Sequence, residues 1–406
     1  MIAWMRLLLT FSSLLHPTCA SQAQAPPLQR SITPQQTRLS PQNLPATTSN
    51  ELLSLHRKLV EIESTSGNEK PVGEWLKGYL EDKNLTVELQ EVEKGRYNVF
   101  AYPGKERKTK VLVSSHIDTV PPYWPYERKT ANGVDEIWGR GSVDAKACVA
   151  AQIVAVLDLL ESESYHLPSD ALSLLFVVAE EVGGDGMRYF SDRKPTNYSA
   201  IVFGEPTEGK LVAGHKGMLG LTLNITGKAA HSGYPWLGIS ANNVLVQALS
   251  TVLALERDDL PGSKKFGKTT VNIGRVSGGL AANVVAESSK AEIAIRIAGG
   301  SPEEINMIIT KALQPLKEET ENAGGIFELQ WSKRAYGTVD IDTDVKGFDT
   351  VTVNYGTDIP NIEGDHKRYL YGPGSIFVAH SDHEHLAVSE LEQSVLDFQK
   401  IILAQF

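Results

Sequence analysis

The sequence predicts an α/β fold, in which a catalytic domain with a mostly parallel, twisted sheet flanked by helices carries an inserted ferredoxin-like α+β domain. Apolar runs such as residues 111–113 and 172–178 lack polar alternation, which is typical of strands buried on both faces of a parallel sheet. Helical segments alternate with these runs. Between residues 213 and 335 the pattern changes to β-α-β-β-α-β order, which is typical of a ferredoxin-like sheet.

The 406 residues, 41% of them hydrophobic, suffice for two or three domains. We predict a signal peptide at residues 1–20 and a disordered leader or propeptide at 21–50. The catalytic domain is expected in two parts, 51–212 and 336–406, with a lid or dimerisation domain inserted between them at 213–335.

The first 20 residues have the features of a secretory signal, with Arg6 followed by an apolar run at 7–15 and small residues at Thr18 and Ala20. That run is far shorter than the ~20 residues that a membrane-spanning helix needs. The segment 21–50 is rich in Pro, Gln, Ser and Thr and has no acidic residue, which is typical of disorder. We therefore expect a secreted, extracellular protein.

The formal net charge of -10 argues against nucleic acid or an anionic membrane as a partner. Cleavage of the signal would remove Cys19 and leave Cys148 alone, so no intrachain disulfide is expected. Three sequons mark candidate glycosylation sites at Asn84, Asn197 and Asn224.

The catalytic part is expected to open with two amphipathic helices, at 52–62 and 72–80, where apolar residues recur at spacings of three and four. An aromatic loop with Tyr123, Trp124 and Tyr126 follows the central strand. We further predict strands at 86–92, 98–102, 109–116, 172–178 and 200–203, and a helix at 146–160.

The inserted domain is expected to alternate as half-buried strands around two helices. We predict its strands at 217–226, 269–276, 286–297 and 326–334 and its helices at 240–255 and 302–318. A closing amphipathic helix carries Val388, Leu391, Val395, Phe398 and Ile402.

Candidate functional residues lie where predicted strands end. The central strand ends in His116 and Asp118, and Asp118 can bind the second ring nitrogen of a metal-ligating His116. Taken alone, this pair is better explained as a buried histidine satisfied by a neighbouring carboxylate. Asp144 alone is equally well explained as a helix N-cap, and Glu180 and Glu181 alone fit a solvated acidic turn.

Taken together, six side chains offer two imidazoles and four carboxylates: His116, Asp144, Glu180, Glu181, Glu205 and His380. Adjacent carboxylates at a strand end are costly unless a cation or solvent lies nearby. Two divalent ions need this kind of set, with one carboxylate bridging both ions. The segment 139–144 lacks a complete phosphate-binding motif, so a nucleotide site is not expected.

Six motifs follow one another along the chain: Ser115-His116-Ile117-Asp118-Thr119-Val120-Pro121, 139–146, Ala179-Glu180-Glu181, Gly204-Glu205-Pro206-Thr207, Ala230-His231-Ser232-Gly233, and Gly372-Pro373-Gly374-Ser375 with His380. Their series resembles the co-catalytic zinc metallopeptidase family of glutamate carboxypeptidase, acetylornithine deacetylase, succinyl-diaminopimelate desuccinylase and aminoacylase. The resemblance runs from about Leu52 to the C-terminus.

The resemblance implies two divalent ions, zinc with cobalt as a substitute, and Asp144 bridging them ahead of a cis peptide bond to Ala145. Each ion would gain one imidazole and one further carboxylate, from His116 with Glu205 and from Glu181 with His380. Many relatives have a larger residue at position 145, and His383 and His385 compete with His380 for the assignment as ligand.

For the remaining site residues, the resemblance implies that Glu180 is the general base and that Asp118 supports the centre. His231 would stabilise the oxyanion from the partner subunit of a homodimer formed through the lid. Asn283 and Arg296 would hold the free carboxylate of the substrate, which suits the bidentate fork of a guanidinium.

The expected chemistry is hydrolysis of an amide by a water held between the two ions, whose pKa falls to ~7, with Glu180 moving its proton. We expect a secreted zinc-dependent carboxypeptidase that acts on short peptides. The alternatives are an N-acyl amino-acid deacylase and a catalytically silent binding protein on the same scaffold.

Overall fold

The computed structural model describes residues 44–162 and 164–406, so the predicted signal peptide and residues 21–43 of the leader lie outside the described part. The first helix, α1 (Ala46–Glu61), begins inside the segment 21–50, so the prediction of disorder is wrong for residues 46–50. These residues form the start of α1, which is held to the core by its buried Leu52 and Leu55, and Pro45 is its N-cap residue.

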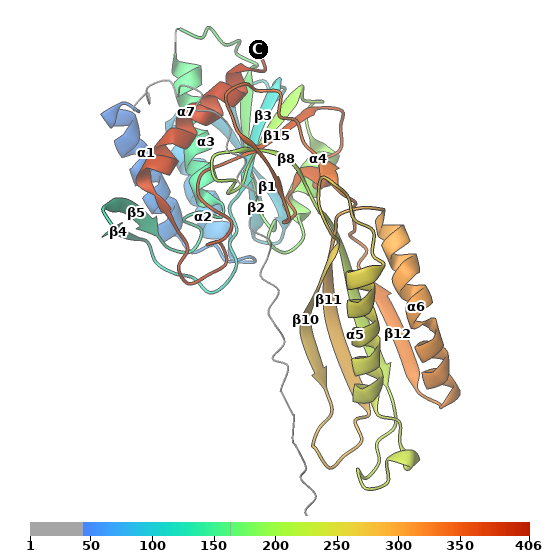
Figure 1. Cartoon of the computed structure of the whole chain (residues 1–406). Coiled ribbons are helices and arrows are strands. Elements are labelled where there is room, and N and C mark those ends of the chain that lie inside the picture. The colour runs from blue at the N-terminus through green and yellow to red at the C-terminus, as the bar shows by residue number, and fades with distance from the viewer. Residues whose placement is uncertain (1–43, 163) are drawn as a thin grey trace, which may run out of the picture. The chain divides into compact units, whose positions relative to one another are not determined.

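The catalytic part is built on a six-stranded sheet in the order β1-β2-β6-β3-β7-β15 (Figure 1). Its strands are β1 (Leu85–Glu93), β2 (Arg96–Pro103), β6 (Leu172–Val177), β3 (Val111–His116), β7 (Ala200–Gly204) and β15 (Lys367–Tyr371). Strands β6, β3, β7 and β15 run parallel, and the β1–β2 hairpin joins them antiparallel. This confirms the predicted mostly parallel sheet.

Alternate residues of β3 enter two different cores. Val111 and Val113 pack with α1, α3 (Lys146–Glu161) and α7 (Val388–Leu403) on one face. Leu112 packs on the other face with α4 (Asp185–Arg193) and the small sheet of β8 (Leu211–His215). Because both faces are covered, the residues of β3, β6 and β7 are mainly apolar, with buried serines as the polar exceptions, and the ionisable side chains follow where these strands end.

The inserted domain has the order β9 (Gly217–Thr226), α5 (Ala241–Asp258), β10 (Thr270–Gly278), β11 (Ser288–Ile297), α6 (Pro302–Asn322) and β12 (Ile326–Trp331). Its sheet has the antiparallel strand order β10-β11-β9-β12, which is the ferredoxin-like arrangement (Figure 1). Helices α5 and α6 cover the face on which Leu219, Leu221, Ile293 and Ile295 are buried.

Several short elements have no counterpart in the prediction. A hairpin of β4 (Glu127–Ala131) and β5 (Val134–Trp138) follows the aromatic loop and pairs with β16 (His385–Ala387). Charged residues at 127–129 and 135–136 hide its alternation. The other short elements without a predicted counterpart are β13 (Val339–Asp340), β14 (Thr350–Val353), η1 (Pro235–Leu237) and η2 (Ile359–Asn361). Helix α2 (Lys70–Asp82), by contrast, was predicted. Among the described residues, no helix combines the length and apolar character needed to cross a membrane.

Candidate metal centre and active site

His116 lies at the carboxyl end of β3 and is 1% exposed. Its Nδ1 donates to the backbone oxygen of Asp118 at 2.9 Å, so Nε2 is the unprotonated nitrogen whose lone pair can bind a metal ion. Nε2 lies 3.1 Å from Asp144 Oδ1 and 3.7 Å from Glu205 Oε1. The tautomer is therefore set by the main chain of Asp118, whereas we predicted its carboxylate, which is 3.6 Å away.

The buried carboxylate of Asp118 instead holds the neighbouring loop. It accepts hydrogen bonds from the backbone N–H of Glu180 at 3.1 Å and of Glu181 at 3.3 Å. Ser66 Oγ donates to it at 2.7 Å. Asp118 thus orients the two adjacent glutamates, and Ser66, which the sequence analysis missed, orients Asp118.

A second imidazole approaches from the other side of Asp144. His380 Nε2 lies 3.3 Å from Asp144 Oδ2 and 3.1 Å from Glu181 Oε2. The two oxygens of Asp144 therefore face two different histidines, which is the arrangement of a bridging carboxylate. The peptide bond from Asp144 to Ala145 is cis, as the resemblance implied.

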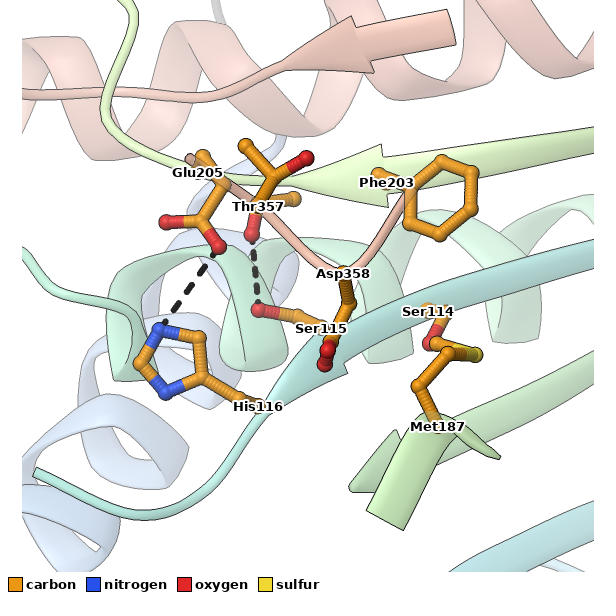
Figure 2. A pocket seen from close by; sticks show the side chains of 9 residues that line it. Ser114, Ser115, His116, Met187, Phe203, Glu205, Thr357 and Asp358 are labelled. Atoms are coloured by element: carbon orange, nitrogen blue, oxygen red, sulfur yellow. Dashed lines mark hydrogen bonds and ion pairs between the residues drawn. The ribbon is translucent and has the colours of Figure 1, made fainter. Parts of the chain in front are cut away.

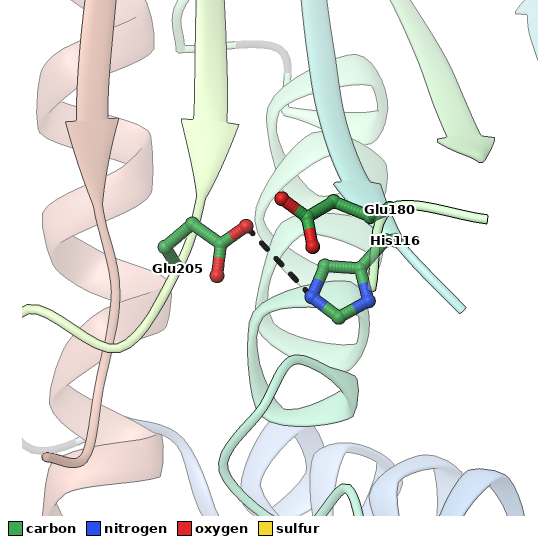
Figure 3. A group of neighbouring side chains, drawn as sticks. All are labelled: His116, Glu180 and Glu205. Atoms are coloured by element: carbon green, nitrogen blue, oxygen red, sulfur yellow. Dashed lines mark ion pairs between the residues drawn. The ribbon is translucent and has the colours of Figure 1, made fainter. Parts of the chain in front are cut away.

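The donor atoms fit divalent ions. Two ligands at 2.0–2.2 Å from one tetrahedral ion are separated by roughly 3.3–3.6 Å, and the contacts of His116 and His380 with the carboxylates span 3.1 to 3.7 Å. Ligand atoms within 4.8 Å of one another form two sets, His116-Glu180-Glu205 and His116-Asp144-Glu181. Figure 3 shows the first set, with the Glu180 carboxylate beside His116. Glu180, predicted to bind neither ion, therefore has a carboxylate oxygen within 4.8 Å of the candidate donors of His116 and Glu205.

Crowding of these carboxylates shifts their pKa values. Burial and the charge of Glu205 raise the pKa of Glu180 well above its usual range. Burial, against the opposing effect of His116, raises that of Glu205 to about 7. Burial also raises the pKa of Glu181, with a contribution from Asp144. Like-charged groups this close ionise together only when positive charge neutralises them, which suits a site for divalent cations.

The segment that carries Asp144 is held by a buried ion pair that the sequence analysis missed. Glu384 Oε1 accepts from the backbone N–H of Val143 at 3.0 Å and of Asp144 at 3.1 Å. Its Oε2 lies 2.7 Å from Arg140 Nη1, and both side chains of the pair are 2% exposed or less. Glu384 follows His380 by four residues, so one carboxylate connects the two segments that carry the candidate metal ligands Asp144 and His380.

A small cavity with room for about one water molecule lies behind the centre (Figure 2). His116 and Glu205 line it together with Ser114 and Asp358. Within the described part of the chain, Ser114 Oγ and Asp358 Oδ2 are buried without a hydrogen-bond partner. Burial raises the pKa of Asp358 to about 6.

Of the predicted site residues in the lid, His231 and Asn283 lie away from this centre. His231 and Asn283 lie close together, since the backbone oxygen of Asn283 accepts from Ser232 N at 3.0 Å and His231 pairs with Val284. Within the part of the chain that the structure describes, neither makes a hydrogen bond or ion pair with the five candidate ligands or with Glu180. Arg296 stands apart from both on β11, half-buried.

The three sequons differ in setting. Asn84 is exposed at the turn before β1, and Asn197 is exposed before β7. Asn224 lies within β9 and is half-buried.

Two family models match the chain. A model of the peptidase dimerisation domain matches residues 213–321, which covers most of the inserted domain. A model of peptidase family M28 matches residues 98–204, which holds β3, β6 and β7 of the central sheet.

Curated relatives extend over most of the chain. Proteins named "probable carboxypeptidase" from Aspergillus terreus and Arthroderma otae are 48% and 47% identical, over 377 and 393 residues. Each alignment covers 87% of this chain and 86% of the relative.

Solved structures share the fold. A tripeptidase from Staphylococcus aureus has a TM-score of 0.70 at 23% identity and covers 88% of this chain and 99% of that one. An M20 family metallo-carboxypeptidase from Sulfolobus solfataricus has a TM-score of 0.66 at 16% identity, with coverages of 87% and 99%. A dinuclear metal-binding M20 peptidase from Bacillus subtilis has a TM-score of 0.59 at 18% identity, with coverages of 89% and 99%.

The predicted fold and family are thus confirmed by independent comparisons, and the centre at the strand ends has the donors of a two-metal site. The chain belongs to the M20 family of metallopeptidases, hydrolases that act on peptide bonds.

Proposed function

We propose that this metallopeptidase is a secreted, zinc-dependent carboxypeptidase that releases the C-terminal residue of short peptides. The observation that carries the proposal is the pairing of a two-imidazole, four-carboxylate centre with Arg296 of the lid sheet, whose Nη1 approaches Gly356 of the catalytic domain. A guanidinium at that place suits a substrate whose free carboxylate lies beside the scissile amide. The name "probable carboxypeptidase" of the curated relatives supports the same reading.

Five residues would hold the ions: His116, Asp144, Glu181, Glu205 and His380. Zinc suits their nitrogen and oxygen donors. When bound, a pair of such ions supplies an activated water and polarises the amide carbonyl. Glu180 would take a proton from the attacking water and deliver it to the leaving nitrogen, as a general base and then a general acid.

The oxyanion donor would come from His231 of the partner subunit in a homodimer. The match to a dimerisation domain supports such a dimer. So does the exposure of Tyr234, Trp236 and Leu237 beside His231, since apolar side chains gathered at a surface favour a protein partner. Light scattering at working concentration tests the assembly.

Secretion is proposed from the signal-like residues 1–20, and glycosylation from the exposed positions of Asn84 and Asn197. Mass spectrometry of the protein from the culture medium tests both, by its N-terminal residue and by the loss of mass after glycosidase treatment.

An N-acyl amino-acid deacylase is the second candidate, because its substrates also place an amide beside a free carboxylate that Arg296 could hold. Turnover of N-blocked dipeptides and of N-acetyl amino acids, with and without a chelator and with zinc or cobalt restored, separates the two. Chelator-sensitive release of a C-terminal residue supports the carboxypeptidase. Turnover of acetyl substrates alone makes the enzyme a deacylase, and no metal-dependent turnover would favour a silent binding protein.

A further inference from the structure

Three residues of the lid sheet stand in one row. Arg296 of β11 pairs directly with Met218 of β9. On the other side of β9, Met218 N donates to the oxygen of Tyr336 at 2.9 Å, and Tyr336 N donates to the oxygen of Met218 at 3.1 Å. Residues directly opposite one another in antiparallel strands project from the same face. Arg296 and Tyr336 therefore project from one face, on either side of Met218.

That face is the one that the lid helices leave uncovered. The neighbouring residues Leu219 and Ile295 are at most 2% exposed and belong to the core beneath α5 and α6. Since side chains alternate along a strand, Arg296 and Tyr336 point the opposite way.

The polar ends of both side chains meet at Gly356, in the second part of the catalytic domain. A Cβ added to Gly356 would lie 3.4 Å from Arg296 Nη1 and closer still to the hydroxyl of Tyr336. Both polar groups therefore lie within 3.4 Å of one point. A residue with a side chain at position 356 would fill the space between them.

The Tyr336 hydroxyl is available for a ligand. It makes no hydrogen bond to any residue within 44–162 or 164–406. Burial raises the pKa of Tyr336 to about 12, opposed by Arg296 and reinforced by Glu180 and Asp358. The phenol is thus a neutral donor beside the guanidinium of Arg296.

We propose that the hydroxyl of Tyr336 donates a hydrogen bond to the free carboxylate of the substrate, beside the ion pair that Arg296 makes with it. This inference rests on the proposed function and refines it, because two donors fixed on one sheet face define where the carboxylate sits relative to the scissile amide. The enzyme would then select substrates whose carboxylate is carried by the residue that leaves.

The test compares holoenzyme of the wild type with Tyr336→Phe, which removes only the hydroxyl. Tyr369→Phe is the matched control. It also removes one tyrosine hydroxyl, which donates a 2.6 Å hydrogen bond to Asp344 Oδ1 outside the site. For each protein, KM is measured for an N-blocked dipeptide, and the inhibition constant is measured for the same dipeptide with a terminal carboxamide. A hydrogen bond to a charged group predicts a rise in KM of roughly 10- to 100-fold in Tyr336→Phe, with kcat and the carboxamide constant little changed.

Equal weakening of both ligands would overturn the assignment, as would unchanged binding or a loss confined to kcat. If the wild type itself does not favour the carboxylate over the carboxamide, the carboxypeptidase proposal fails first and the role of Tyr336 fails with it. Preference in the wild type that Tyr336→Phe leaves intact refutes the role of Tyr336 alone.

Discussion

Replacing Glu384 by Ala tests how the metal-binding segments are held together. The change leaves the guanidinium of Arg140, 2% exposed, without its carboxylate, and the backbone N–H groups of Val143 and Asp144 without their acceptor. Breaking a buried ion pair by removing one partner costs about 3–5 kcal/mol. Loss of a group that orients a metal ligand costs about 10- to 100-fold in metal affinity.

The free energy of unfolding is measured by urea denaturation of the metal-free proteins, and metal affinity by competition with a chelator of known strength. Glu384→Gln is the informative partner variant. Its carboxamide oxygen can still accept from Val143 and Asp144, but it cannot neutralise Arg140. We expect Glu384→Gln to lose about 1.5–3 kcal/mol of stability while retaining most of the metal affinity, whereas Glu384→Ala loses both.

A loss below about 1 kcal/mol in Glu384→Ala, with unchanged metal affinity, would refute this account of the ion pair. Equal metal loss in Glu384→Ala and Glu384→Gln would show that the charge matters and that the hydrogen bonds to the backbone of Asp144 do not.

Glu180→Gln should keep its metal content and lose about 10²- to 10⁴-fold in kcat; metal loss by elemental analysis would instead make Glu180 a ligand. Ser66→Ala removes a hydrogen bond to the buried Asp118 carboxylate and should cost about 1.5–3 kcal/mol in urea unfolding. Burial, partly opposed by the hydrogen bond to the oxygen of Ser142, lowers the pKa of His56 to about 4 in the folded chain. Because the unfolded chain binds more protons between that value and ~6.5, the stabilisation is present above pH 6.5 and about 3 kcal/mol is lost as the pH falls to 4. His56→Gln should abolish that part of the acid slope in urea titrations.

The central sheet and the cluster of candidate metal ligands could be predicted because both follow from the burial of the parallel strands. Strands covered on both faces must be apolar, so a polar residue at their end stands out, as His116 does after 111–113 and Glu205 after β7. The fold of the lid could be predicted as well, since every second residue of β9 is buried.

The residues missed by the sequence analysis act through contacts that no local pattern encodes. Glu384 differs from other acidic residues only because Arg140, 244 positions away, is buried against it. Tyr336 follows β12 in a stretch without periodicity, and only the pairing with Met218 places it in the row of Arg296. The sequence signal that bears on Tyr336 is Gly356, where the absence of a side chain leaves room for two others.

The two oxygens and the main chain of Asp118 explain why a single acidic residue after β3 supports so much of the site. Its backbone oxygen accepts the hydrogen bond from Nδ1–H of His116, so the carboxylate is left for other donors. Those donors are the N–H groups of Glu180 and Glu181, which set where the proposed base and a proposed ligand stand. The main chain of Asp118 thus fixes His116 at the end of β3, while its side chain fixes the loop after β6. The spacing of the imidazole and the two carboxylates therefore follows from the register of these two adjacent parallel strands.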